Sequence, residues 1–204
     1  LDGMAALGLN VLHLHLNDDQ GFRVETPSCP ELFERAANGE YLREAEIERL
    51  VADAGIRGIR VVPELDVPGH AGAILWARPE LAAAQPPATL PRAFGPSRHA
   101  LDPTKAETWA LLEAVVGDLV RHFDDPFLHM GGDEVHPEVY AFPDPQRRAW
   151  CEARGLAGAE DVQRWFGAEM AALLERHGRR PIAWDEALSP ELPEAVVVQS
   201  WRGA

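Results

Sequence analysis

Cysteine, basic residues and long apolar runs are all scarce in this sequence, and each shortage narrows what the protein can be. Only two cysteines occur among 204 residues, and Cys29 and Cys151 lie too far apart to form a metal-binding motif. Lysines and arginines number 19 against 33 acidic residues, so the net charge is −14. A surface this acidic repels phosphate backbones, and we expect no nucleic-acid partner. No segment approaches the ~18 consecutive apolar residues of a membrane-spanning helix, so we expect no membrane span.

What the chain does contain is a regular alternation of short apolar runs and amphipathic stretches. The apolar runs have the length and composition of β-strands and cover residues 10–16, 56–65, 126–132, 180–186 and 194–201. Helical periodicity falls between them, over residues 43–54, 103–122 and 160–177. Strand–helix–strand repetition of this kind indicates an α/β protein with a parallel sheet.

Local signals also predict where these elements begin and end. We expect Gly55 to terminate the first helix, and Asp102 with Pro103 to cap and begin the second. Residues 66–101 and 135–150 are expected to be long loops. Both loops follow strands, on the side of the sheet where α/β folds place their sites.

The chain opens within a helix-like stretch and stops directly after its last predicted strand. A (β/α)8 barrel usually takes about 250 residues, whereas we count only five strands in the sequence. We therefore expect residues 1–204 to form a single domain that is an incomplete (β/α)8 TIM barrel. An open barrel exposes two sheet edges and apolar faces, so we also expect weak stability or self-association.

The strand-like run at residues 10–16 has one apolar and one polar face. Leucines at alternate positions leave His13 and His15 on the polar face, and Asp18 follows just beyond the strand end. Two interpretations stay open. The histidines are hydrogen-bonding residues inside the barrel, or they belong to a metal-dependent hydrolase and bind the metal with Asp18 or Asp133, to which His129 could be added. Loss of activity to a chelator would favour the second.

Two adjacent acids follow a pair of glycines in the stretch FLHMGGDEVHP. In a regular strand, Asp133 and Glu134 would point to opposite faces. Gly131 and Gly132 allow the backbone to leave extended geometry, so both carboxylates can turn toward one ligand. Adjacent residues cannot readily flank a scissile bond across the ~5–9.5 Å that separates the two acids of ordinary glycosidases. A division of labour on one side of a sugar suits them better.

Further polar and aromatic side chains are expected at the same rim. His70 lies at the tip of a Pro-Gly turn after the second strand, where it can orient a neighbouring acid. Trp184 and Trp201 end the last two strands and resemble walls for sugar stacking or for a small apolar substituent. Asp185 and Glu186 form a second acidic pair without a glycine hinge, for which we expect a supporting role.

The order and spacing of six motifs resemble those of the family 20 glycoside hydrolases, the β-N-acetylhexosaminidases: LNVLHLHLNDDQGFR, VVPELDVPGHA, LDPT, FLHMGGDE, IAWDEAL and VVVQSWRG. The resemblance spans nearly the whole chain and implies a (β/α)8 catalytic barrel in which the five strands are the second to the sixth. The first strand, with a sugar-binding arginine, would be missing. So would the last two, with a tyrosine, an acid and a further tryptophan. We therefore expect the chain alone to turn over substrate poorly.

The same resemblance implies a chemical role for each acid. The family uses no enzyme nucleophile; the 2-acetamido oxygen of the substrate attacks C1 and forms an oxazolinium-like intermediate, and configuration is retained. By resemblance, Glu134 is the general acid, and Asp133 holds the acetamide N–H and stabilises the charge that develops on it. A charged Asp133 disfavours a second charge nearby, which keeps Glu134 protonated when substrate arrives.

The remaining site residues follow in the same way. Trp184 and Trp201 match the tryptophans that wall the acetamide pocket, and Asp18 with His70 matches a pair that supports the acid. The implied substrate is an oligosaccharide or glycoconjugate that ends in N-acetylglucosamine or N-acetylgalactosamine, and no metal or other cofactor is implied. A non-catalytic sugar-binding relative is the last alternative. The intact acidic pair speaks against it, because a binding module needs no acid.

Overall fold

Parallel strands form the sheet around which the chain is organised. In the computed structural model, which describes residues 1–93, 95 and 97–203, the order of the strands in this sheet is their order in the sequence. The strands are β1 (Val11–His15), β4 (Arg60–Glu64), β5 (Phe127–His129), β6 (Arg180–Trp184) and β7 (Val197–Gln199). Each strand is parallel to the next, so the predicted α/β class with a five-stranded parallel sheet is confirmed.

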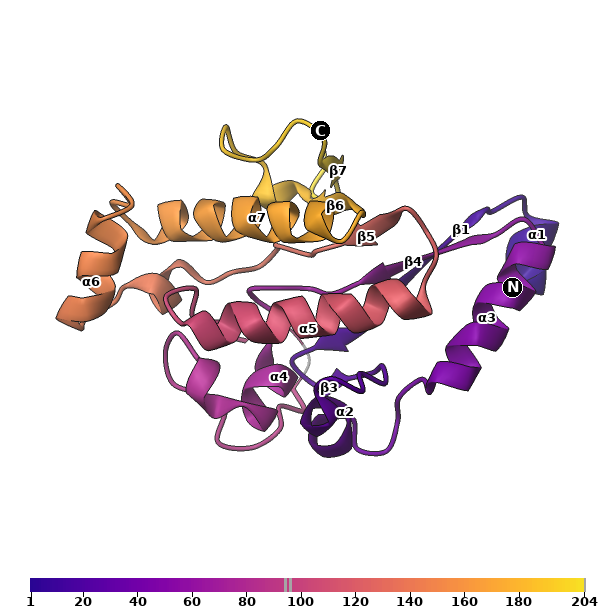
Figure 1. Ribbon diagram of the computed structural model, residues 1–204, viewed down its shortest axis with the longest axis horizontal. Helices are drawn as coiled ribbons and strands as arrows, with labels where there is room; N and C mark the ends of the chain where they lie inside the picture. Colours follow the sequence, from indigo (N-terminus) through magenta and orange to yellow (C-terminus); the bar gives the residue numbers. More distant parts are fainter. Residues whose placement is uncertain (94, 96, 204) are drawn as a thin grey trace.

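Long helices make most of the connections between these strands. α3 (Glu44–Ile56) precedes β4, α5 (Ala106–His122) precedes β5 and α7 (Ala159–Arg176) precedes β6. Figure 1 shows α5 and α7 lying side by side, and Trp109 of α5 packs on Phe166 of α7 with ring centroids 5.0 Å apart. Apolar residues three and four positions apart form the buried stripe of α5, namely Leu111, Leu112, Val115, Val116 and Leu119.

Shorter elements complete the connections. β2 (Asn17–Asp18) and β3 (Gly21–Phe22) form a small antiparallel pair after β1. The short α-helices are α1 (Asp2–Ala6), α2 (Pro30–Ala36), α4 (Gly72–Ala77) and α6 (Pro145–Glu152), and the 3-10 turns are η1 (Pro79–Leu81), η2 (Pro137–Tyr140) and η3 (Asp185–Ala187). Within the described ranges, none of the helices has the length and apolar character needed to cross a membrane.

The predicted start of α5 is wrong. The Oδ1 atom of Asp102 accepts hydrogen bonds from the backbone N–H of Thr104 at 3.0 Å and from its hydroxyl at 2.7 Å. The other carboxylate oxygen of Asp102 lies 2.9 Å from Nη2 of Arg147. The Asp102 side chain therefore closes a local turn in place of capping a helix, and α5 begins later, at Ala106.

Two other local predictions are also wrong. Gly55 lies inside α3, and Gly58, with φ +69°, takes the left-handed conformation that follows the helix. Residues 135–150, expected to be a loop, include most of α6, in which Asp144 accepts a hydrogen bond from the N–H of Arg147 at 3.0 Å. The Asp-Pro sequence at the start of α6 is a helix signal that the loop prediction overlooked.

Alternation along β1 and register across the sheet decide which polar side chains meet inside the barrel. The leucines of β1 pack against the core, so His13 and His15 point to the other face. Glu64, the last residue of β4, is in register with His15 on one side and with His129 on the other. Side chains 49 residues apart in the sequence, His15 and Glu64, are thereby brought into contact.

The two edges of the sheet carry exposed apolar side chains. β1 and β7 are the edge strands. Val11 of β1 is 43% exposed, and Val197 and Val198 of β7 are 39% and 37% exposed. The backbone groups along such an edge can pair with a further strand.

Candidate active site

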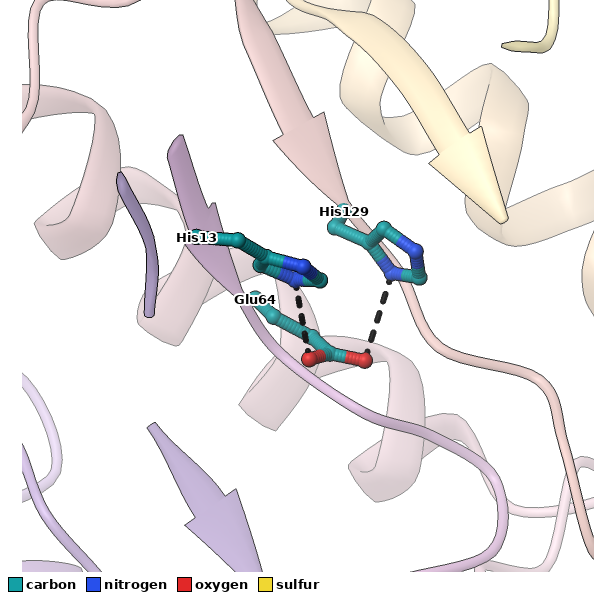
Figure 2. Close-up of side chains that lie close together, drawn as sticks. All are labelled: His13, Glu64 and His129. Atoms are coloured by element: carbon teal, nitrogen blue, oxygen red, sulfur yellow. Dashed lines mark ion pairs between the residues drawn. The ribbon is translucent and has the colours of Figure 1, made fainter. Parts of the chain in front are cut away.

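A buried carboxylate, Glu64, gathers the polar side chains inside the barrel. Its Oε2 lies 2.8 Å from Nδ1 of His15 and 3.0 Å from Nε2 of His13, and its Oε1 lies 3.3 Å from Nδ1 of His129. The indole N–H of Trp184 donates to Oε1 at 2.8 Å. In Figure 2, His13 and His129 each pair with one oxygen of this carboxylate. Glu64 thus has nitrogen partners on both oxygens.

The environment keeps Glu64 charged although it is only 1% exposed. Burial alone would raise the pKa of Glu64, but hydrogen bonds from the surrounding histidines hold it well below its usual range. Glu64 is not among the site residues expected from the sequence. An acid that ends an otherwise apolar strand was the available signal, but the partners of Glu64 come from other strands and are set by register.

The orientation of His13 and His129 does not suit a metal ion held between them and Glu64. Donor atoms of His13, Glu64 and His129 do lie within 4.8 Å of one another. However, the rings of His13 and His129 are stacked, with centroids 4.7 Å apart and planes inclined by 29°. An imidazole binds metal through a lone pair in its own plane, so stacked rings direct their lone pairs alongside each other and not at one point. Among the described residues, no group of potential metal ligands contains both His13 and His15.

His70 connects Asp18 to the two adjacent acids. Its Nδ1 lies 2.9 Å from Oδ1 of Asp18. On the opposite side of the ring, Nε2 lies 3.4 Å from Oε2 of Glu134 and 3.6 Å from Oδ2 of Asp133. Although adjacent in the sequence, the two acids therefore face one side chain, and the structure brings four of the six predicted site residues together.

The backbone of His70 is held in an unusual conformation. His70 has φ +47°, in the left-handed region that costs a non-glycine residue about 1 kcal/mol or more. The side-chain amide of Asn17 holds this loop: its Nδ2 donates to the carbonyl of Asp66 at 2.8 Å and to that of His70 at 3.2 Å. The N–H of Asp66 donates in return to Oδ1 of Asn17 at 2.8 Å. These hydrogen bonds fix the imidazole in its position between the carboxylates.

The charges of His70, Asp18 and Asp66 depend on burial and on the ionisable groups beside them. Burial alone would lower the pKa of His70, but its hydrogen bond to Asp18 and the nearby carboxylates raise it to about 9. Burial would raise the pKa of Asp18, but hydrogen bonds from His15 and His70 hold it well below its usual range. Burial and the charge of Asp133 raise the pKa of Asp66 well above its usual range. At neutral pH, His70 is thus a cation paired with the Asp18 anion, and the charged form of Asp66 is disfavoured.

The two glycines before the acids have positive φ angles, and neighbouring side chains leave little room for a Cβ atom at either position. Gly131 has φ +69°, and a Cβ atom there would lie 1.7 Å from Oδ1 of Asp66. Gly132 has φ +99°, and its N–H donates to the same oxygen at 3.1 Å. Glu134 is itself left-handed, with φ +50°, and its N–H donates to Oε2 of Glu186 at 3.0 Å. Glu186 thus supports the turn that presents the acids.

Asp133 and Glu134 differ in their exposure. The side chain of Asp133 is 14% exposed and that of Glu134 is 32% exposed. The Oδ1 atom of Asp133 is buried, and no described residue donates a hydrogen bond to it. Buried carboxylate oxygens nearly always accept a hydrogen bond. An oxygen without such a donor is therefore suited to accept one from the N–H of a ligand.

The two tryptophans of the predicted pocket lie in different environments. The Trp184 ring packs at a tilt against the rings of His129 and His13, with centroids 4.7 and 5.8 Å away, and is thus part of the Glu64 cluster. Trp201 follows β7 and is 52% exposed, with its backbone N–H donating to Oδ1 of Asp185 at 3.3 Å. Of these two tryptophans, Trp184 is the one whose side chain is held by a hydrogen bond and by neighbouring rings.

Comparison of the sequence with known proteins leads to the family that the motifs resemble. The sequence model of the glycosyl hydrolase family 20 catalytic domain matches residues 1–204. The chain is 33% identical over 219 residues to a beta-hexosaminidase of Akkermansia muciniphila, and the match covers 99% of this chain and 43% of that protein. It is 31% identical over 223 residues to a beta-hexosaminidase of Porphyromonas gingivalis, covering 100% of this chain and 27% of that protein.

Solved structures with the same arrangement include a chitobiase of Flavobacterium johnsoniae, with a TM-score of 0.92 and 35% identity. That match covers 99% of this chain and 30% of the chitobiase. An exo β-N-acetylglucosaminidase of Vibrio harveyi, solved with N-acetylglucosamine, has a TM-score of 0.85 and 27% identity, covering 99% of this chain and 35% of that one. The chain therefore spans less than half the length of these relatives, and the expected barrel fold is confirmed.

Proposed function

The chain belongs to glycosyl hydrolase family 20, and from this membership we propose that it is part of the catalytic domain of an exo-acting β-N-acetylhexosaminidase. Such an enzyme removes terminal N-acetylglucosamine or N-acetylgalactosamine from an oligosaccharide or glycoconjugate. The observation that carries the proposal is the position of Asp133 and Glu134, which both face Nε2 of His70 at 3.6 and 3.4 Å. Two acids on one side of a ligand suit a reaction in which the substrate supplies its own nucleophile.

The proposed reaction has two steps. Glu134 gives its proton to the glycosidic oxygen while the 2-acetamido oxygen of the substrate attacks C1, so the aglycone leaves and an oxazolinium intermediate forms. Glu134, now a carboxylate, takes a proton from water, and the water oxygen attacks C1. The bond between C1 and the acetamide oxygen breaks, so the oxazolinium ring opens and the 2-acetamido group is restored. Each step inverts C1, and two inversions retain the configuration.

Asp133 is proposed to act on the acetamide group. Its buried Oδ1, to which no described residue donates, is suited to accept the acetamide N–H. An anion at this position also stabilises the positive charge that spreads over the acetamide nitrogen as the oxazolinium forms. Asp133 would therefore both orient the nucleophilic oxygen and lower the energy of the intermediate.

His70 and Asp18 are proposed to orient the acids. The ion pair of Asp18 and His70 fixes the imidazole, and Nε2 of His70 then directs one oxygen of Glu134. The other oxygen is left to meet the glycosidic bond. Trp184 is proposed as a wall of the acetamide pocket, and Trp201 as a second wall that turns inward from its exposed position.

Two further proposals concern the chain as a unit. We propose that residues 1–204 belong to a single catalytic domain. We also propose that this chain alone associates with itself through β1 and β7, the edges of its sheet, where Val11, Val197 and Val198 are exposed. Pairing of unpaired edge strands and burial of their apolar side chains would both favour association.

Release of a fluorogenic aglycone from an N-acetyl-β-glucosaminide by the whole protein tests the proposed activity. Replacement Glu134→Gln removes the transferable proton but keeps the size of the side chain. We expect it to reduce kcat/KM by roughly 10²–10⁴-fold, the usual contribution of a general acid. Glu138→Gln, at a glutamate that is 70% exposed in the nearby η2 turn, is the matched control and should leave kcat/KM unchanged. Equal rates for the parent and Glu134→Gln would overturn the proposal, and inhibition by a chelator would favour metal-dependent hydrolysis.

A further inference from the structure

Glu64 has no part in the proposed reaction steps, yet its carboxylate contacts four side chains: His13, His15, His129 and Trp184. We infer that Glu64 is a positioning residue, which fixes the indole of Trp184 through its N–H and thereby sets how large an N-acyl group the pocket accepts. The inference rests on the proposed function, because it concerns the acetamide pocket of that reaction.

The carboxylate of Glu64 is fixed at both oxygens. Its Oε1 accepts the indole N–H of Trp184 at 2.8 Å, while its Oε2 lies 2.8 Å from Nδ1 of His15 and 3.0 Å from Nε2 of His13. Partners on both oxygens prevent rotation about the terminal bond of the side chain. The acceptor for the Trp184 indole is therefore held at one point inside the barrel.

The faces of the indole are also constrained. The Trp184 ring lies 4.7 Å from the ring of His129 at an inclination of 55°, and 5.8 Å from the ring of His13 at 37°. These rings limit movement of the indole toward the β1 and β5 strands, and the N–H bond to Glu64 limits its rotation in its own plane. One directional bond and two ring contacts define a wall better than packing alone.

The wall is tied to the strand that carries the acids. The backbone N–H of Trp184 donates to the carbonyl of Gly131 at 3.0 Å, directly before the turn that presents Asp133 and Glu134. A tilt of the indole would therefore change the distance between the pocket wall and the acids. In a substrate-assisted reaction, this distance decides whether the acetamide oxygen is pressed toward C1.

The chemistry of the site requires an anion at position 64. His15 is paired with Glu64 and lies 3.6 Å from Oδ2 of Asp18, so a charged imidazole sits between two carboxylates. A neutral amide at position 64 would leave this cation with Asp18 alone. It could also direct its own NH2 group at the indole N–H, and two donors cannot bond. A glutamate can accept from both the Trp184 indole and the His15 imidazole, whereas a glutamine has only one accepting oxygen.

A buried ion pair that only stabilises the fold would share these contacts, so the test must separate positioning from stability. The whole protein, Glu64→Gln, Trp184→Phe and the double variant are assayed on two fluorogenic glycosides, one with a 2-acetamido and one with a 2-propionamido group. For each variant, kcat and KM are measured on both, and the ratio of the two kcat/KM values gives the N-acyl selectivity.

If Glu64 acts through Trp184, Glu64→Gln lowers kcat/KM for the acetamido substrate by about 10–100-fold, the effect of losing one charge-assisted hydrogen bond. The selectivity for the acetamido group falls with it. Adding Glu64→Gln to Trp184→Phe then changes kcat/KM by no more than about twofold, because the bond is already absent. Independent effects that multiply in the double variant would overturn the inference, as would an unchanged selectivity in Glu64→Gln.

A second variant covers the case in which Glu64→Gln does not fold, judged by circular dichroism. Trp184→3-benzothienylalanine keeps the size and shape of the indole but replaces the N–H donor with sulfur, and leaves the ion pairs of Glu64 intact. We expect the same loss of selectivity, and an unchanged ratio would overturn the inference alone. A parent enzyme that hydrolyses neither glycoside would instead overturn the proposed function, and this inference with it.

Discussion

Nε2 of His70 lies 3.4 Å from Oε2 of Glu134, on the side of the ring opposite the hydrogen bond to Asp18. The proposed general acid, Glu134, thus faces an imidazole whose charge depends on Asp18 at the other ring nitrogen. Asp18 is held as an anion by His15 and His70, and His70 is held as a cation by Asp18 and the nearby carboxylates. Asp18 can therefore influence the pH range of the proposed reaction through the charge of His70.

The first prediction is that Asp18→Asn moves the alkaline limit of activity to lower pH. In the parent, burial alone would lower the pKa of His70, but the hydrogen bond to Asp18 and the charges of Asp66, Asp133 and Asp18 together raise it to about 9. Activity that depends on the His70 cation should therefore persist to about pH 9 and fall above it. Without the Asp18 charge, the pKa of His70 returns toward its usual value near 6.5, and the fall in kcat/KM should begin at least one pH unit earlier.

The measurement is a pH profile of kcat/KM for the parent, for Asp18→Asn and for Asp124→Asn, an exposed aspartate that serves as the control. Asp124→Asn should follow the parent at every pH. If Asp18→Asn lowers activity equally at every pH without moving the alkaline limit, His70 does not act through its charge.

The second prediction concerns the stability of the fold. His70 and His15 have pKa values raised to about 9 and about 10, above the value near 6.5 expected in the unfolded chain. A folded state that binds protons more tightly is stabilised fully below pH ~6.5 and loses this stabilisation as the pH rises through the folded pKa values. The melting temperature should therefore fall by several degrees between pH 7 and pH 10.

Calorimetric melting of Asp18→Asn separates these histidines from other groups that titrate in the same range. The variant removes a partner of both His15 and His70. Its melting temperature should be lower than that of the parent at pH 7 and should depend less on pH. Parallel curves for the two proteins from pH 7 to pH 10 would rule out the histidines as the cause.

The third prediction uses two glycines with the same backbone conformation and different surroundings. Gly131 has φ +69° and Gly155 has φ +70°, but a Cβ at Gly131 would lie 1.7 Å from Asp66, whereas at Gly155 nothing lies within 4 Å. Gly155→Ala should cost about 1 kcal/mol of unfolding free energy, the cost of a left-handed alanine. Gly131→Ala should cost several-fold more, about 3 kcal/mol or above, because backbone or Asp66 must move.

Denaturant unfolding of both variants gives these values, and the assay on an N-acetyl-β-glucosaminide gives their activity. Gly155→Ala should retain the activity of the parent, and Gly131→Ala should lose it, because the turn that presents the acids is displaced. Similar stability losses in the two variants would mean that the strand can move away from Asp66 without cost.

Much of the fold could be predicted from the sequence because the periodicity of apolar residues within each segment indicates a strand or a helix. The leucines of β1 alternate with histidines, and the buried stripe of α5 repeats at three and four residues, so each element type follows from its own residues. One error, at the start of α6, came from overlooking a local Asp-Pro signal, whereas the error at Asp102 involved a partner that is distant in the sequence. Asp102 was expected to cap a helix, but it is bound by Thr104 and by Arg147, which comes from the following α6.

Some residues of the candidate site could be predicted from the sequence and others could not. Asp133 and Glu134 could be found because the glycines before them announce a turn. Glu64 could not, since its partners are 49 residues earlier and 65 or 120 residues later, and only the register of the sheet joins them. The pocket role of Trp201 was inferred from its place at a strand end and from the motif resemblance, neither of which predicts that this residue is 52% exposed in this chain.

The last prediction tests the sheet edges. At micromolar concentration, the 204-residue chain should show a mass above the monomer value of 22.4 kDa by light scattering. Val11→Lys and Val198→Lys place charges on the edge strands β1 and β7 and should shift the mass toward the monomer, because a buried lysine opposes strand pairing. Ile56→Lys is the matched control: this side chain is 83% exposed but lies at the end of α3, off both edges. Equal dissociation by all three would indicate general solubilisation, and a monomeric parent with a sharp cooperative unfolding transition would show that the edges do not associate.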